Sequence, residues 1–139
     1  MSASTKLSTA VRALCFLAEH HPDPQTSADI SKFSEINASK IRQILSMLVK
    51  GGIVKSSYGK KGGFMLNKEP AKLHLQEVYC AIEDRKAFYL NVSKSTAQIK
   101  PKLNSLNNYF LNFFADIQID IEEKMKKITL EQILLHLKQ

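Results

Sequence analysis

Apolar residues in the first part of the chain recur at spacings of three and four, which is typical of helices that bury one face. Residues 5–21 follow this pattern until a proline interrupts it, because proline cannot continue a helix. A second, short helix is predicted to open at Thr26, which forms the pattern of a capping box with Asp29. Ile30 and Phe33 are expected to face inward from it. The pattern therefore predicts two packed helices before residue 35.

The next stretch predicts a third helix and a hairpin. Asn37 can cap the helix, a pair of glycines ends it at residues 51–52, and its apolar face consists of Ile41, Ile44, Leu45 and Leu48. Two β-prone runs, residues 53–56 and 64–66, flank a Gly-Lys-Lys-Gly-Gly tip and are predicted to pair. Two short helices joined by a tight turn and followed by a hairpin indicate a winged helix-turn-helix.

The second half of the chain contains a longer apolar pattern. A fourth helix is predicted from Leu75, after which residues 85–102 lose periodicity and are interpreted as a connector. An apolar seam close to heptad register then runs along about 23 residues, or roughly 35 Å; it consists of Leu103, Leu106, Phe110, Phe113, Ile117, Ile121 and Met125. A domain this small cannot cover such a helix on all sides, so we expect a second copy of the chain to cover the remainder. The candidates for the dimer interface are Leu103, Leu106, Phe110, Phe113, Ile117 and Ile121. Thr129 and Gln132 are predicted to cap a last helix whose buried face is Leu130, Ile133, Leu134 and Leu137.

The length of 139 residues suits one ordinary domain with an appended helix. The predicted fold class is mainly α with a small β-hairpin: a winged helix-turn-helix plus a long C-terminal dimerisation helix. We divide the chain into a DNA-binding domain (1–84), a connector (85–102), and the dimerisation and C-terminal helices (103–139).

The net charge of +7 is uneven along the chain. Residues 1–70 contain ten bases against five acids, and the segment from Asn37 to Lys68 contains seven Lys or Arg and no acid. Excess positive charge suits nucleic acid, an anionic membrane surface or an acidic protein, and alone it does not choose among them. A helical, acid-free segment with one exposed face favours a polyanion.

Three groups of residues are candidates for contact with double-stranded DNA. Polar side chains on the outer face of the third helix suit base edges, the hairpin tip suits phosphate or the minor groove, and a helix N-terminus attracts phosphate. The alternatives are a solvated helix face, a plain hairpin turn and a structural cap. The candidates are Ser39, Lys40, Arg42, Gln43 and Ser46 in the helix, Tyr58, Lys60 and Lys61 in the tip, and Thr26 and Ser27 at the N-terminus of the second helix.

The sequence gives little support for an enzyme, a metal site or a membrane protein. There is no nucleophile with a base, no pair of carboxylates in an apolar setting, no phosphate loop and no histidine spacing suited to metal. Cys15 and Cys80 lie in apolar helical patterns, where cysteine behaves as a small hydrophobe, and a redox-sensing role at Cys15 is the alternative. No run is long enough to span a membrane and the charged first 20 residues do not fit a signal peptide, so we expect a cytoplasmic protein without a membrane partner.

Several segments together resemble the IscR-type (BadM-like, Rrf-two) family of dimeric winged-helix transcription regulators. They are residues 6–14, 26–30, 37–45, 51–54, 57–63 and 75–83, and the Gly-x-x-Gly-Gly wing is the most specific of them. The resemblance implies DNA binding and dimerisation through the long helix. Tyr58 stands where many relatives carry arginine, and His74 stands where a Ser or Thr usually caps the fourth helix.

The resemblance also raises the question of a cofactor. Sensor members of the family hold an iron–sulfur cluster with three closely spaced cysteines in the connector, whereas residues 84–102 contain no cysteine. Because a cluster needs several converging thiolates, we expect no cofactor of this kind. A small molecule between the fourth helix and the dimerisation helix, thiol chemistry at Cys15 and a partner protein stay open as signals.

The hypothesis from sequence is a homodimeric transcriptional regulator, most simply a repressor, that binds a palindromic operator. The alternative is a winged-helix adaptor that docks proteins without sequence-specific DNA binding, because fold alone does not establish function.

Overall fold

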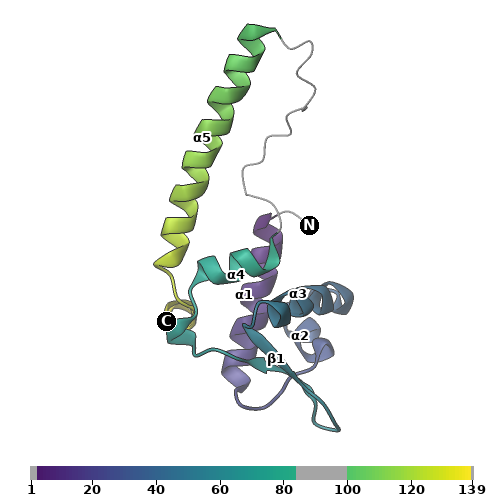
Figure 1. Ribbon diagram of the computed structural model, residues 1–139. Coiled ribbons are helices and arrows are strands. Elements are labelled where there is room, and N and C mark those ends of the chain that lie inside the picture. Colours follow the sequence, from purple (N-terminus) through teal and green to yellow (C-terminus); the bar gives the residue numbers. More distant parts are fainter. Residues whose placement is uncertain (1–2, 84–99, 139) are drawn as a thin grey trace.

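The computed structural model describes residues 3–83 and 100–138 (Figure 1). The predicted fold class is confirmed: helices dominate, and the two strands form one antiparallel hairpin. The elements in chain order are α1 (Ala3–His20), α2 (Ser27–Ser34), α3 (Ala38–Lys50), β1 (Val54–Ser57), β2 (Gly63–Leu66), the 3-10 turn η1 (Pro70–Lys72), α4 (Leu75–Ile82), α5 (Pro101–Lys126) and α6 (Leu130–Leu137).

The helix ends are set by the local signals in the sequence. Thr26 caps α2 in a reciprocal box: its hydroxyl accepts from the Asp29 amide at 3.1 Å, and the Asp29 carboxylate accepts from the Thr26 amide at 3.1 Å. The Asn37 side chain accepts from the Ser39 amide at 2.7 Å and begins α3. Gly52, with φ of 74°, takes the left-handed conformation just after this helix. The predicted capping residues of α2 and α3 are therefore confirmed.

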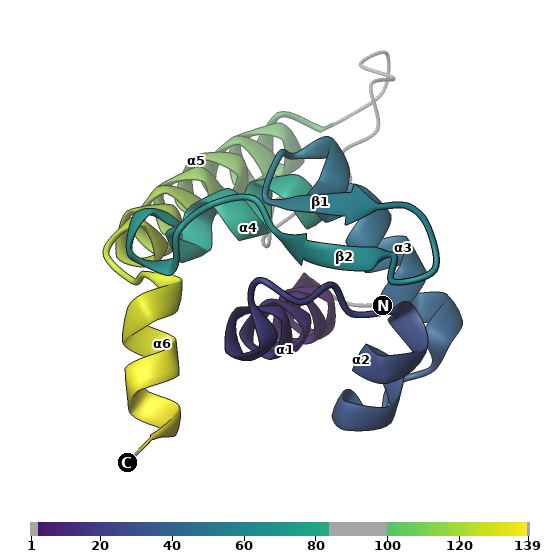
Figure 2. The ribbon, with the colours of Figure 1, turned by 90° about the horizontal axis from the view of Figure 1, so that it is seen from below.

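The core is built around α1, which packs against α2, α3, α4 and α6. Figure 2 shows α2 and α6 on either side of α1, with the hairpin lying across it. Fully burying a large aliphatic side chain contributes about 1.5–3 kcal/mol to stability. The buried cluster around α1 therefore holds the helix-turn-helix and the hairpin as one unit. The large side chains that are fully buried include Leu14, Leu17, Ile30, Ile41, Ile44, Leu45, Leu48, Ile53 and Leu73.

The hairpin is anchored to the start of α2 by a third backbone segment. Val54 pairs with Leu66 and Ser57 with Gly63. Beyond the hairpin, the Gln25 amide donates to the Phe64 carbonyl at 2.9 Å, and the Phe64 amide donates to the Gln25 carbonyl at 2.8 Å. A Cβ added to Gly63 would lie 2.6 Å from the Gln25 carbonyl oxygen. Glycine at this position therefore permits the close approach that ties β2 to residue 25.

The last two helices leave the core and return to it. Most of α5 extends away from the other elements in Figure 1, while its later part packs against α4. The chain then turns so that the Leu75 amide donates to the Ile128 carbonyl and the Leu130 amide donates to the Leu73 carbonyl, both at 2.8 Å. Leu130 joins the core cluster around α1. The start of α6 is thereby fixed beside the start of α4.

Three predictions about single residues were wrong. Phe33 is 52% exposed, with its ring tilted against that of Phe16, because Ile30 and Ser34, one turn apart, already take the buried face of α2. Cys80 is exposed, since the buried face of α4 consists of Val78, Tyr79 and Ile82. Leu137 is exposed because it lies in the last turn of α6, beyond the core.

The predicted connector falls mostly on residues 84–99, which lie outside the described residues. The remaining part of that prediction was wrong, because Pro101 and Lys102 already belong to α5. Proline is well suited to the first turn of a helix, where its missing N–H removes no hydrogen bond.

Candidate nucleic-acid interface

The outer face of α3 is polar, positive and open. The four residues that helical spacing assigns to the apolar face of α3 are all buried in the core. The predicted orientation of this helix is therefore confirmed. Neither an aspartate nor a glutamate occurs in α3. The predicted contact residues Ser39, Lys40, Arg42, Gln43 and Ser46 are all exposed. Their amide, hydroxyl, ammonium and guanidinium groups are the types that read base edges and phosphates.

The hairpin tip projects beside α2 and α3 and carries two positive charges (Figure 1). Lys60 and Lys61 are exposed, and Tyr58 is 92% exposed. The Gly62 amide donates to the Gly59 carbonyl at 3.0 Å and closes the turn. The tip therefore presents an aromatic ring and two ammonium groups on a short, closed loop.

The third predicted group, at the start of α2, has a different character. Thr26 is exposed and Ser27 half-buried, but the Thr26 amide already donates to Asp29. That hydrogen bond, and as a smaller cause a hydrogen bond between the carboxylate and the Thr26 side chain, lower the pKa of Asp29 below its usual 3.8. A carboxylate therefore already lies at the N-terminus of α2, where its negative charge opposes a phosphate. The structure favours a structural cap over an anion site at Thr26.

The structure also connects the hairpin to the start of α2 by backbone hydrogen bonds that the spacing of apolar residues does not predict. Gln25, which pairs with Phe64 of the hairpin, is the residue before Thr26. The hairpin and the start of the helix-turn-helix are consequently one hydrogen-bonded unit. The only local sign of this contact is Gly63, and a hairpin turn alone would account for a glycine there.

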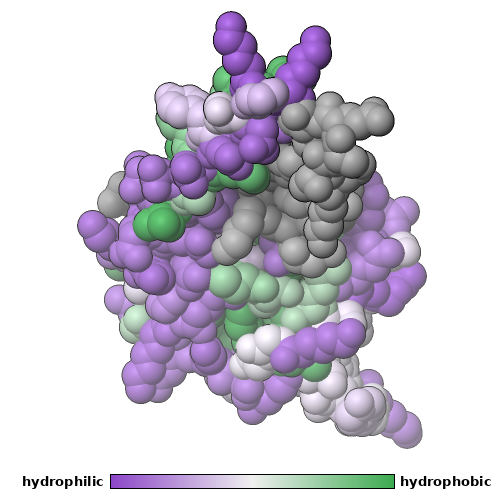
Figure 3. All heavy atoms as spheres, turned by 45° about the horizontal axis from the view of Figure 1, so that its top comes forward, coloured by the Kyte–Doolittle hydropathy of each residue, from purple (hydrophilic) through white to green (hydrophobic). Residues whose placement is uncertain are grey.

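Much of the apolar seam of α5 is uncovered. Leu103, Leu106, Phe110 and Phe113 are 37–52% exposed, Ile117 and Ile121 are half-buried, and Met125 is buried. Sequence reasoning missed the neighbouring Tyr109, Leu111 and Ile119, which are also exposed. A space-filling view with the far end of α5 brought forward shows apolar residues exposed among hydrophilic ones (Figure 3). Exposed apolar surface of this kind marks interaction sites.

A polar contact lies at the point where the seam becomes covered. Gln118 donates through Nε2 to the Tyr79 hydroxyl at 3.3 Å, and both residues are buried between α5 and α4. A buried hydrogen bond of this kind favours one packing arrangement of the two helices, because burying a polar group without a partner costs free energy.

Cys15 does not suit the redox-sensing role considered from sequence. Cys15 is buried in the core, and burial, followed by the negative charge of Glu19, raises the pKa of its thiol to about 11. Its thiolate, which is the reactive form, is therefore scarce at neutral pH. This opposes the predicted redox role at Cys15.

An iron–sulfur cluster of the usual kind does not fit this chain either. The whole sequence has two cysteines, one buried in α1 and one exposed on α4. Within residues 3–83 and 100–138, no group of three His, Cys, Asp or Glu side chains is placed to hold a metal ion. Nor does any helix in these ranges have the length and apolarity needed to cross a bilayer.

The arrangement of α1 to α4 and the hairpin, with a long helix after it, defines a winged helix-turn-helix protein with an appended C-terminal helix. The model of the Rrf2 family, described as "Iron-dependent Transcriptional regulator", matches residues 3–136. The chain belongs to the Rrf2 family of transcriptional regulators, and the family resemblance seen in the sequence is confirmed. This is a family of regulators and not of enzymes.

Individual relatives agree with this assignment. The chain is 27% identical to the putative HTH-type transcriptional regulator YwgB of Bacillus subtilis over 111 residues, covering 80% of this chain and 67% of that protein. It is 34% identical to the HTH-type transcriptional regulator IscR of Photorhabdus laumondii over 85 residues, covering 60% of this chain. The matched region spans only about half of that IscR (52%).

Solved structures share the fold over almost the whole chain. IscR of T. potens superposes with a TM-score of 0.70 at 24% identity, covering 99% of this chain and 88% of that one. CymR, described as the global cysteine regulator of B. subtilis, superposes with a TM-score of 0.69 at 22% identity, covering 95% of both chains. A putative transcriptional regulator from Lactobacillus plantarum reaches 0.82 at 22% identity, covering 96% and 90%.

Proposed function

We propose that this protein is a homodimeric repressor that binds a two-fold symmetric operator in double-stranded DNA. The observation that supports it is the exposed, acid-free face of α3 beside a cationic hairpin tip, both held on one buried core. In this proposal α3 enters the major groove, and the tip lies against the minor groove or the backbone. The DNA-binding unit is residues 1–84.

The apolar seam of α5 supports the dimer. Four of its large residues are substantially exposed, and pairing with a second copy would remove them from water. A two-fold dimer presents its two α3 helices symmetrically, so the operator is a palindrome with half-sites one or two DNA turns apart. Residues 103–139 form the dimerisation unit in this proposal.

The proposed contacts fall into two kinds. Arg42 and Gln43 read bases, since guanidinium pairs with guanine and a side-chain amide pairs with adenine. Lys60 and Lys61 bind phosphates, and Tyr58 packs its ring against the sugar-phosphate backbone. Ser39, Lys40 and Ser46 position α3 in the groove.

The experiment measures binding to DNA fragments from upstream of the protein's own gene by fluorescence anisotropy at several salt concentrations. Replacing Arg42 by alanine is expected to relax base preference at one operator position, at a cost of about 1–3 kcal/mol. The double variant Lys60→Ala with Lys61→Ala should weaken specific and non-specific DNA alike and reduce the salt slope by about 2. The matched control is Lys124→Ala, which removes an exposed lysine on α5 and should change neither the base preference nor the salt slope.

Two results would overturn the proposal. The first is a folded, dimeric protein that protects no palindromic site at low salt, which would favour the adaptor alternative. The second is an operator affinity that is the same in wild type and in the two-lysine variant. Repression is tested separately with a reporter behind the operator: removing the protein should raise transcription, and a fall would make it an activator.

A further inference from the structure

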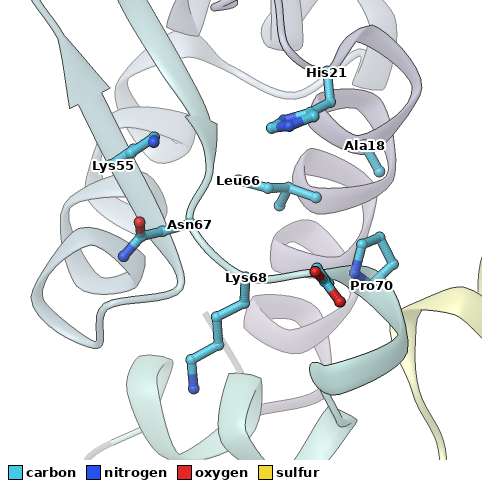
Figure 4. A pocket seen from close by; sticks show the side chains of 8 residues that line it. Ala18, His21, Lys55, Leu66, Asn67, Lys68 and Pro70 are labelled. Atoms are coloured by element: carbon cyan, nitrogen blue, oxygen red, sulfur yellow. The ribbon is translucent and has the colours of Figure 1, made fainter.

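A cavity of about 310 Å³ opens where the end of α1 meets the base of the hairpin (Figure 4). Its walls come from α1 and the turn after it, from β1, from the end of β2 and from the segment that leads into η1. The lining residues are Ala18, His21, Lys55, Leu66, Asn67, Lys68, Glu69 and Pro70. The cavity lies outside the residues proposed to touch DNA.

The cavity has an apolar floor. Leu66 is buried at the end of β2, and Ala18 and Pro70 are half-buried. In Figure 4 the three side chains lie on one side of the opening, with Leu66 near its centre. A hydrocarbon group placed there would exclude water from aliphatic surface, which is favourable.

The polar groups of the cavity favour a negative ligand. In Figure 4 the His21 ring extends from the end of α1 toward the space beside Leu66, and Lys55 of β1 lines the cavity from the other side of β2. Within the part of the chain that the structure describes, the Lys55 ammonium has no ion-pair partner. A carboxylate beside Leu66 would meet this ammonium and a ring nitrogen of His21.

The other two charges of the lining are already engaged. Lys68 turns away from the cavity and pairs with Glu77 on α4. The Glu69 carboxylate lies 3.7 Å from the Lys72 ammonium, which offsets its repulsion of an anion. Lys55 is therefore the charge available to a ligand.

We propose that this cavity is a binding site for a small amphipathic monocarboxylate, whose carboxylate contacts Lys55 and His21 and whose hydrocarbon part covers Leu66, Ala18 and Pro70. Its volume lies at the lower end of the roughly 300–1,000 Å³ found for small-molecule sites, which selects a compact aliphatic or aromatic acid. Such a ligand would touch α1 and both strands at the base of the hairpin. The site stands independently of the proposed DNA contacts.

The test uses the full chain, titration calorimetry and amide NMR shifts, with benzoate and hexanoate as probes. At least one acid should bind saturably, with a dissociation constant below about 5 mM, and should shift amides at residues 18–21, 55 and 66–70. Benzamide and hexylamine, which match the hydrocarbon but lack the carboxylate, should bind at least about tenfold more weakly, since a hydrogen bond to a charged group is the stronger one.

Variants locate the site. Lys55→Gln should weaken the acid at least about tenfold, and Ala18→Leu should weaken it by filling the floor. Lys50→Gln, an exposed lysine at the end of α3, is the matched control and should bind as wild type does. If Ala18→Leu disturbs folding, Lys55→Gln still decides, because its side chain is exposed. The proposal fails if neither acid binds, if benzamide binds as well as benzoate, if the shifted amides lie elsewhere, or if Lys55→Gln leaves affinity unchanged.

Discussion

The contact between Gly63 and Gln25 makes a prediction that can be worked out from the structure. In Gly63→Ala the new Cβ would lie 2.6 Å from the Gln25 carbonyl oxygen and 2.7 Å from its carbonyl carbon. Both are backbone atoms, so no rotation of a side chain relieves the overlap. The φ of 153° at this position adds strain for any residue with a Cβ.

The cost has two parts. An unfavourable backbone conformation costs about 1–3 kcal/mol. Moving Gln25 away from the hairpin also breaks its two backbone hydrogen bonds with Phe64, each worth a net amount of about 0.5–1.5 kcal/mol. The free energy of unfolding should therefore fall by about 2–6 kcal/mol, a large share of the roughly 5–15 kcal/mol that a domain has.

Gly59→Ala separates the two parts. Gly59 also has positive φ, at 108°, but a Cβ there meets nothing within 4 Å. It should cost only the strain of about 1–3 kcal/mol. Urea unfolding followed by circular dichroism measures both variants. Hydrogen exchange should show faster exchange of the Phe64 amide in Gly63→Ala alone, because that amide donates to Gln25. Equal losses in the two variants, with the Phe64 amide still protected in both, would refute the reasoning.

Three further predictions concern α5, the cysteines and the first capping box. Leu106→Asp combined with Phe113→Asp should give a folded monomer by light scattering, since charge on the seam opposes pairing of two copies. At pH 8 an alkylating reagent should modify Cys80 rapidly and Cys15 only after unfolding, because burial raises the pKa of Cys15 to about 11; intact mass reports this. Asp29→Asn should lower stability at pH 7, and the difference from wild type should shrink as the pH falls below 3.8, because the folded state lowers this pKa and loses that stabilisation when the carboxylate is protonated.

Each of these has a control and a contrary outcome. Asn112→Asp adds one charge on α5 outside the seam and should stay dimeric; a monomer in this variant would mean that charge on α5, and not the seam, governs assembly. Cys80→Ser should remove the fast-reacting thiol, and a remaining fast reaction would show that Cys15 is accessible. For Asp29→Asn, a stability difference that stays constant from pH 7 to pH 2 would rule out the carboxylate as its source.

The features predicted correctly from the sequence are those that depend on residues close together in the chain. Apolar spacing within α3 sets its buried face, and the exposed face follows from it. The boxes at Thr26 and Thr129 close within three residues and need no tertiary information. The errors are of another kind. Phe33 and Cys80 lie at the margins of apolar faces, where the shape of the neighbouring helices decides which side chain is covered. Likewise, the only residue of β2 that hints at its pairing with residue 25 is Gly63, and a hairpin turn alone would account for a glycine there.

The apolar seam of α5 shows most clearly what periodicity leaves open. One repeat runs through the helix, yet Met125 is buried by its own chain while Leu103 and Leu106 are exposed. The same spacing thus serves two different contacts, and the pattern itself does not say where one ends. Gln118 marks the point, because it is buried and hydrogen-bonded to Tyr79 of α4. Turning α5 about its axis would break this buried hydrogen bond, at a cost of about 0.5–1.5 kcal/mol. The contact therefore fixes the direction in which the exposed part of the seam faces relative to α4, and through the shared core relative to α3. If two copies pair through that seam, this one rotation sets the distance between their two α3 helices.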